Sequence, residues 1–151
     1  MTRALGACLA MLIALPGSAT LAEAACTISA TSVAFGSYDV FATTPRDSTG
    51  TVTYRCGPSD HHITVTISRG SSTTFTPRTL VNGTGRLQYN LFRDAALATV
   101  WGDGTGGTDT YFIVNPPNAQ DVVLTVYARV PAEQDVPAGA YADAVVVTLE
   151  Y

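Results

Sequence analysis

Apolar and polar residues alternate at every second position along the last part of the chain. This period of two, carried by β-branched and aromatic residues, predicts a strand with one face on a core. The turn signal Pro137-Ala138-Gly139 lies near its start, so we predict a strand over residues 136–151. Such a strand must either lie inside a sheet or leave an edge and a groove for another chain. The face with the larger side chains is expected to point inward, and it comprises Tyr141, Asp143, Val145, Val147, Leu149 and Tyr151.

Shorter alternating stretches separated by turn residues precede this strand. Residues 75–81 are ambiguous, because Pro77 is unfavourable in a central strand. The high glycine content of residues 101–107 predicts a loop there. Residues 94–98 could form one helical turn. Roughly six to eight short strands predict an all-β sandwich. The other predicted strands cover residues 27–35, 49–56, 63–68, 86–93, 109–115 and 122–130.

The first 24 residues have the pattern of a secretory signal. Arg3 supplies the positive start, residues 4–15 are apolar, and Ala22-Glu23-Ala24 matches a cleavage site. A membrane anchor is the weaker interpretation, since the apolar run is short for a bilayer. We therefore expect an exported protein with a signal peptide at 1–24 and one domain at 25–151.

Composition limits the partners that the mature chain can have. Only 13% of the residues are charged, the formal net charge is −4, and the chain contains no lysine. These values offer no basic patch for nucleic acid or for anionic lipid.

Two cysteines, Cys26 and Cys56, would remain after cleavage. Two cysteines in an exported chain are expected to pair. A loop of about 30 residues would stabilise the fold by about 3–4 kcal/mol on the chain-entropy argument. The alternatives are a metal pair or a reactive thiol, for which no supporting ligands lie nearby.

The sequence offers no convincing catalytic or metal constellation. His61 and His62 are adjacent, so they would face opposite ways on a strand. Asp103 and Asp109 flank the glycine-rich loop, but their spacing is not that of an EF-hand calcium site. We predict a non-enzymatic protein without a cofactor, metal or small-molecule substrate. Three aromatic residues could instead stack on sugar, although buried packing is their commoner use: Tyr38, Trp101 and Tyr111.

Several short motifs, weak one by one, are specific in their order and spacing. Between them the motifs cover essentially all of residues 26–151, and the chain resembles the spore coat protein U domain family, which includes subunits of archaic chaperone–usher pili. The motifs are Cys26, Phe35-Gly36-x-Tyr38-Asp39, Cys56, Leu87-x-Tyr89-Asn90-Leu91-Phe92-x-Asp94, Val100-Trp101-Gly102-Asp103-Gly104-Thr105, Tyr127-Ala128-Arg129-Val130-Pro131 and Pro137-Ala138-Gly139-x-Tyr141-x-Asp143.

The resemblance implies an immunoglobulin-like sandwich that lacks its last strand. In such pilins a periplasmic chaperone, and then the N-terminal extension of a neighbouring subunit, supplies that strand. The implied partners are the chaperone, an outer-membrane usher and neighbouring pilins, and the implied location is the cell surface. The implied function is that of a fibre subunit in adhesion or biofilm formation. The residues expected to border the groove are Val145, Val147, Leu149 and Tyr151.

One departure from the family concerns the stretch before Cys26. Shaft subunits carry a donor strand there, whereas cleavage after Ala24 would leave one residue, and cleavage after Ala19 would leave Thr20 to Ala25, which span about 20 Å. We therefore expect a subunit that accepts a strand and donates poorly, as at a fibre tip. The alternatives are a secreted spore-coat or surface-coat protein and a glycan- or surface-binding adhesin module.

Overall fold

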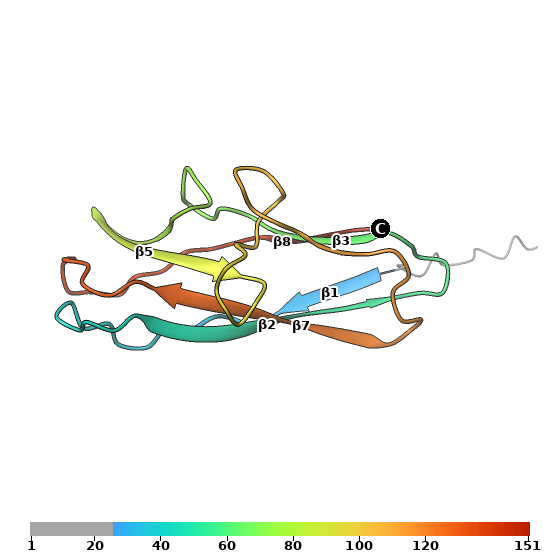
Figure 1. Ribbon diagram of the computed structural model, residues 1–151, viewed down its shortest axis with the longest axis horizontal. Coiled ribbons are helices and arrows are strands. Elements are labelled where there is room, and N and C mark those ends of the chain that lie inside the picture. Colours follow the sequence, from blue (N-terminus) through green and yellow to red (C-terminus); the bar gives the residue numbers. More distant parts are fainter. Residues whose placement is uncertain (1–25) are drawn as a thin grey trace, which may run out of the picture.

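The computed structural model describes residues 26–151, which form two antiparallel sheets packed face to face (Figure 1). The predicted signal peptide lies outside the described residues. One sheet has five strands in the order β1-β2-β7-β5-β4, and the other has three in the order β6-β3-β8. The eight strands of the described part are β1 (Cys26–Ala30), β2 (Arg46–Cys56), β3 (Ile63–Ile67), β4 (Arg78–Asn82), β5 (Gly85–Phe92), β6 (Tyr111–Ile113), β7 (Asp121–Val130) and β8 (Val147–Glu150).

The all-β prediction is confirmed. Residues 26–151 contain no helix, and hence none long and apolar enough to cross a bilayer. The predicted helical turn at 94–98 is wrong. Asp94 instead closes a tight turn there, because its carboxylate accepts hydrogen bonds from the N–H groups of Ala98 at 3.1 Å and Thr99 at 2.7 Å.

The five-stranded sheet is built on the long pairing of β2 with β7. Its register runs from Arg46 opposite Val130 to Arg55 opposite Asp121. Alternate residues of β2 face the second sheet and are almost completely buried, as period-two patterning requires: Val52, Tyr54 and Cys56.

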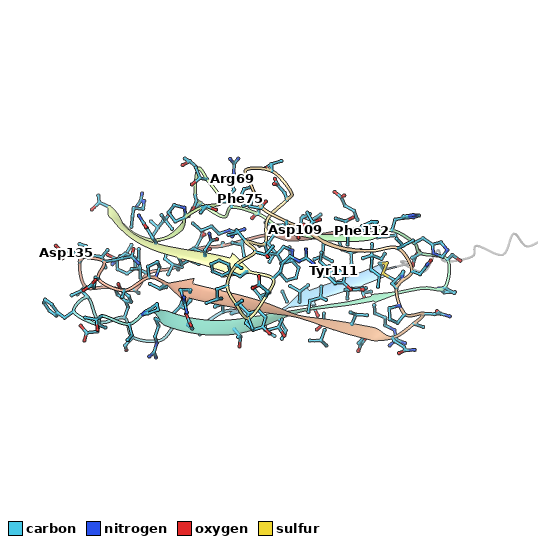
Figure 2. All side chains as sticks on the ribbon, viewed as in Figure 1. Arg69, Phe75, Asp109, Tyr111, Phe112 and Asp135 are labelled. Carbon is cyan, nitrogen blue, oxygen red and sulfur yellow. A yellow bond between two sulfur atoms is a disulfide. The ribbon has the colours of Figure 1, made fainter. Side chains whose placement is uncertain are left out.

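The three-stranded sheet covers this face with the same alternation. Ile63, Val65 and Ile67 of β3 are at most 1% exposed. On the next strand Tyr111 is half-buried and packs against Tyr54 with 6.0 Å between ring centroids, whereas its neighbour Phe112 is 54% exposed (Figure 2).

Trp101 fills the middle of the core from the loop between β5 and β6. It is 1% exposed, and its Nε1–H donates to the Val65 carbonyl oxygen at 3.0 Å. The indole is therefore not available to stack on a sugar, in agreement with the expectation that buried packing is the commoner use of such a residue.

The ambiguous stretch before the Asn82-Gly83 turn contains a true strand. Pro77 lies just before β4, so its missing N–H removes no ladder hydrogen bond. β4 and β5 then form a hairpin in which Asn82 faces Gly85, and Gly83 adopts a φ of 55°.

The prediction of a continuous strand over 136–151 is partly wrong. Only Val147–Glu150 form a ladder, with β3, and residues 136–146 make a single bridge, between Ala142 and Val81. A strand needs a paired neighbour along its length, and the five-residue β3 offers few partners. The inward and outward alternation nevertheless holds from Tyr141 to Leu149, where odd-numbered residues are half-buried and even-numbered residues are exposed.

Candidate functional site

An open boundary between the two sheets begins where β1 ends. β1 is an edge strand, and its pairing with β2 ends after the hydrogen bond from the Thr31 N–H to the Thr51 carbonyl at 2.9 Å. The chain then crosses Gly50 so closely that a Cβ there would lie 2.9 Å from Val33 Cγ2. Within residues 26–151, the N–H groups of residues 32–38 donate no backbone hydrogen bond.

This segment is nevertheless fixed in place by two side chains of β2. Arg46 Nε donates to the Phe35 carbonyl at 2.8 Å, and the Ser48 hydroxyl donates to the Ala34 carbonyl at 2.7 Å. Side-chain hydrogen bonds thus replace the ladder at these two carbonyls, and the N–H groups of residues 32–38 have no backbone acceptor in the described part of the chain.

The opposite wall is the segment that leads into β8. It is paired on one side only, through two hydrogen bonds between Val81 and Ala142 at 2.8 and 3.2 Å and one from the Ser68 N–H to the Val146 carbonyl at 2.9 Å. Because backbone groups point alternately to the two sides of an antiparallel strand, those of Val145 and Val147 point to the unpaired side. Val145 makes no backbone hydrogen bond in the described part of the chain.

Two adjoining cavities lie between these walls, with volumes of about 340 Å³ and 910 Å³. We call them together the groove, because four residues line both cavities. The smaller cavity has an apolar floor that includes Val52, Ile67, Leu91 and Val126. The larger is bordered by residues 33–41 and 136–143. The four shared residues are Val33, Phe35, Leu80 and Asp143.

Asp143 is the polar centre of the groove. Its Oδ2 accepts a hydrogen bond from the Tyr89 hydroxyl at 2.7 Å, and its Oδ1 accepts from the N–H and hydroxyl of Ser71 at 2.9 and 2.8 Å and from the Ala144 N–H at 2.9 Å. Burial opposes ionisation, but these hydrogen bonds outweigh it and lower the pKa of Asp143 below its usual range. Burial raises the pKa of the Tyr89 hydroxyl, and its hydrogen bond to Asp143 raises it further.

A glycine makes room for this carboxylate. A Cβ on Gly70 would lie 2.2 Å from Asp143 Oδ2, and the φ of Gly70, 63°, is one that residues with side chains rarely adopt. The loop that follows β3 is thereby brought against the last segment of the chain.

The residues predicted to border a groove are not all equivalent. Val145 and Val147 line the smaller cavity. Leu149 packs against the core beyond it, and Tyr151 is 60% exposed. Contact of these four residues with a partner strand stays a prediction.

Sequence reasoning missed the opposite wall and the floor. The wall residues Val33 and Phe35 belong to a predicted strand. Their alternation along that strand was the signal that could have indicated this wall. Leu80 and Leu91 come from β4 and β5, and no local pattern indicates that these strands reach the groove.

The predicted disulfide is present and fastens the start of β1. Cys26 and Cys56 are joined by an S–S bond of 2.07 Å and pair directly across β1 and β2. Asp60 Oδ2 lies 3.6 Å from Cys26 Sγ. Because the two sulfurs are bonded to each other, neither is a thiolate ligand for a metal or a reactive thiol.

The remaining candidate residues are dispersed or already engaged. His61 and His62 precede β3 rather than lie on it, and the His62 ring lies near the Phe112 ring, tilted by 30° with 6.3 Å between centroids. Asp109 forms an ion pair with Arg93, whereas Asp103 accepts hydrogen bonds from Thr105 at 2.9 and 2.6 Å. The loop thus does not bring the two carboxylates to one shared ligand position.

The family model of the Spore Coat Protein U domain matches residues 13–148. The chain belongs to this family. Its two-sheet fold agrees with the sandwich that the resemblance implied. No curated protein matches.

A solved structure shows the same fold. It is the pre-assembly complex of a chaperone and a tip adhesion subunit from the archaic chaperone–usher Csu pili of Acinetobacter baumannii. The TM-score is 0.58 and the identity 24%, over 83% of this chain and 39% of the chain in that structure. This Spore Coat Protein U domain protein thus spans less than half the length of its structural neighbour, and at this identity the likeness concerns the fold.

Proposed function

We propose that this protein is an exported, non-enzymatic subunit of an archaic chaperone–usher pilus or related surface fibre. In this role its groove accepts an extended strand, first from a periplasmic chaperone and then from a neighbouring subunit. An outer-membrane usher would assemble the fibre at the cell surface, where it serves adhesion or biofilm formation.

The groove is the observation that carries the proposal. Both of its walls carry backbone groups without a backbone partner in the described part of the chain, and its floor is apolar. A strand inserted between them would satisfy backbone groups of residues 32–38 on one wall and of Val145 and Val147 on the other, while its alternate side chains fill the cavities. An unfilled groove of this kind leaves an edge open to aggregation, which is a reason for a chaperone to cover it.

Family membership and the structural neighbour support the same role. The neighbour is a tip adhesion subunit in complex with its chaperone, captured before assembly. The Spore Coat Protein U domain match covers nearly the whole sandwich of this chain.

Expression of the full chain with and without a chaperone and usher from the same genome tests the proposal. We expect periplasmic protein to be recovered as a one-to-one complex with the chaperone, and labelled fibres to appear on cells only when the usher is also present. Immunogold electron microscopy would show whether the label lies along the fibre or at its end. A chaperone-free monomer with a high and fully reversible melting transition would contradict the proposal, because a complete fold needs no strand.

A further inference from the structure

The residues that line the groove are mostly apolar, and only two of them are charged. These are Asp39, which is exposed and lines only the larger cavity, and Asp143, which lines both cavities; no cationic residue of the described chain belongs to either lining. The central charge of the groove is therefore a carboxylate, and any strand that fills the groove must cover it.

The hydrogen bonds of Asp143 leave a place for one more donor. Its Oδ1 is held by three donors, but its Oδ2 accepts only from Tyr89 among the described residues. A carboxylate oxygen can accept at least two hydrogen bonds, and Oδ1 here accepts three, so Oδ2 with one donor has capacity left.

The nearby cation does not use this capacity. The buried guanidinium of Arg78 directs its N–H groups to the carbonyl oxygens of Ile67, Ser68 and Trp101 and to the side chain of Asn90. Asp143 forms no salt bridge with any side chain in residues 26–151. Covering an ionised carboxylate with apolar atoms alone would cost free energy that a hydrogen-bond donor would offset.

We infer that the strand accepted by this groove carries a hydrogen-bond donor, such as serine, asparagine or lysine, at the inward position that faces Asp143. Apolar side chains fill the inward positions on either side of it, and a carboxylate is excluded there. Asp143 is then a specificity-determining residue: it fixes which register of a strand fits and which neighbouring subunits are accepted. This inference rests on the proposed function of the groove.

Synthetic strands can test the inference directly. Peptides about 11 residues long, which span about 36 Å when extended, would carry valine at inward positions and threonine at outward positions. One inward valine at a time is replaced by serine, lysine, leucine or glutamate. Binding to protein from periplasmic expression of the full chain is measured by fluorescence anisotropy, and the shift in melting temperature is recorded.

The expected result is a preference confined to one inward position. There the serine and lysine peptides bind about tenfold more tightly than the leucine peptide, and the glutamate peptide binds more weakly than all of these. In Asp143→Asn the advantage of lysine over leucine disappears. In the matched control Asp39→Asn it persists, because Asp39 is exposed and does not line the smaller cavity.

The outcomes separate this inference from the proposal on which it rests. If peptides bind but leucine equals or exceeds serine and lysine at every position, the role of Asp143 is overturned and the groove still accepts strands. If no peptide binds or raises the melting temperature, the proposed function fails and the inference with it. Melting curves of both variants without peptide check that they fold.

Discussion

Arg78 and Asn90, on neighbouring strands, form a buried pair in which the Arg78 Nη1–H donates to Asn90 Oδ1 at 2.8 Å. The Arg78 side chain is 0% exposed, and its other N–H groups reach the Trp101 carbonyl at 2.7 Å, the Ser68 carbonyl at 3.1 Å and the Ile67 carbonyl at 3.4 Å. The guanidinium thus joins the five-stranded sheet, β3 and the Trp101 loop. Burial lowers the pKa of Arg78.

Replacing Arg78 with methionine should therefore be strongly destabilising. The substitution removes the Arg78 donors of three carbonyl oxygens and leaves Asn90 Oδ1 with only the Leu91 N–H, so we expect the free energy of unfolding to fall by about 3–5 kcal/mol. Urea denaturation followed by tryptophan fluorescence measures this, since Trp101 lies at the site. Arg86→Met is the control, because Arg86 is exposed and bonds only nearby carbonyls. Equal losses for the two variants would contradict the argument.

Removing the disulfide should lower stability without changing the fold. For Cys26→Ser/Cys56→Ser we expect a loss of about 3–4 kcal/mol, because a closed loop of 30 residues no longer restricts the unfolded chain. Denaturation of the oxidised protein and the double variant gives the difference, and the periplasmic yield should fall with it. Two labelled thiols in the native, unreduced protein would refute the pairing.

A charge in the groove should block strand capture, whereas the same charge one residue away should not. Val147 lines the smaller cavity, so Val147→Asp places a carboxylate against the apolar floor and should abolish recovery of the chaperone complex. Val146 is 63% exposed and points to the opposite face, so Val146→Asp should leave the complex intact. Affinity purification of tagged chaperone compares the variants. Equal capture of both would count against the groove as the contact.

Acid should weaken the fold through Asp143. Because the pKa of Asp143 is lowered in the fold, its contribution is complete above the unfolded value of 3.8 and is lost as the pH falls through the lower folded value. Urea titrations between about pH 6 and pH 2 should show stability falling below about pH 4, with a smaller fall in Asp143→Asn.

Asp47→Asn provides the comparison for this pH series. The Arg129 guanidinium lowers the pKa of Asp47 by hydrogen bonding, but the pair lies in solvent, with side chains 39% and 52% exposed. Asp47→Asn should therefore flatten the pH profile less than Asp143→Asn. The reverse order would mean that the groove carboxylate is not the main acid-sensitive group of the two.

Strand positions could be predicted where alternation is local. Residues 49–56, 63–68 and 122–130 show it clearly and fall on β2, β3 and β7. The ends of strands could not, because they depend on neighbours distant in sequence. The predicted first strand continued to Phe35, yet pairing stops near Thr31, where the chain crosses Gly50.

The groove was only half predictable for the same reason. Val145 and Val147 stand out in the pattern of the last segment, because the side chains on its odd-numbered face are larger than those on its even-numbered face. Leu80 and Leu91 enter the groove only because β5 pairs with β7 and β4 pairs with β5 in the five-stranded sheet. The alternation places Asp143 on the inward face but does not predict its partners, because Tyr89 and Ser71 are 54 and 72 residues away in the chain.

The disulfide also determines how the domain would carry mechanical load. Tension applied to the chain ahead of Cys26 passes through the S–S bond into Cys56, at the end of β2. β2 is held along its length by β7, from Arg46 to Arg55, so the pull is shared by a long ladder loaded in parallel. The short β1 is bypassed and cannot be peeled away from its first residue. The disulfide therefore keeps tension away from β1 and from the wall of the groove that follows it.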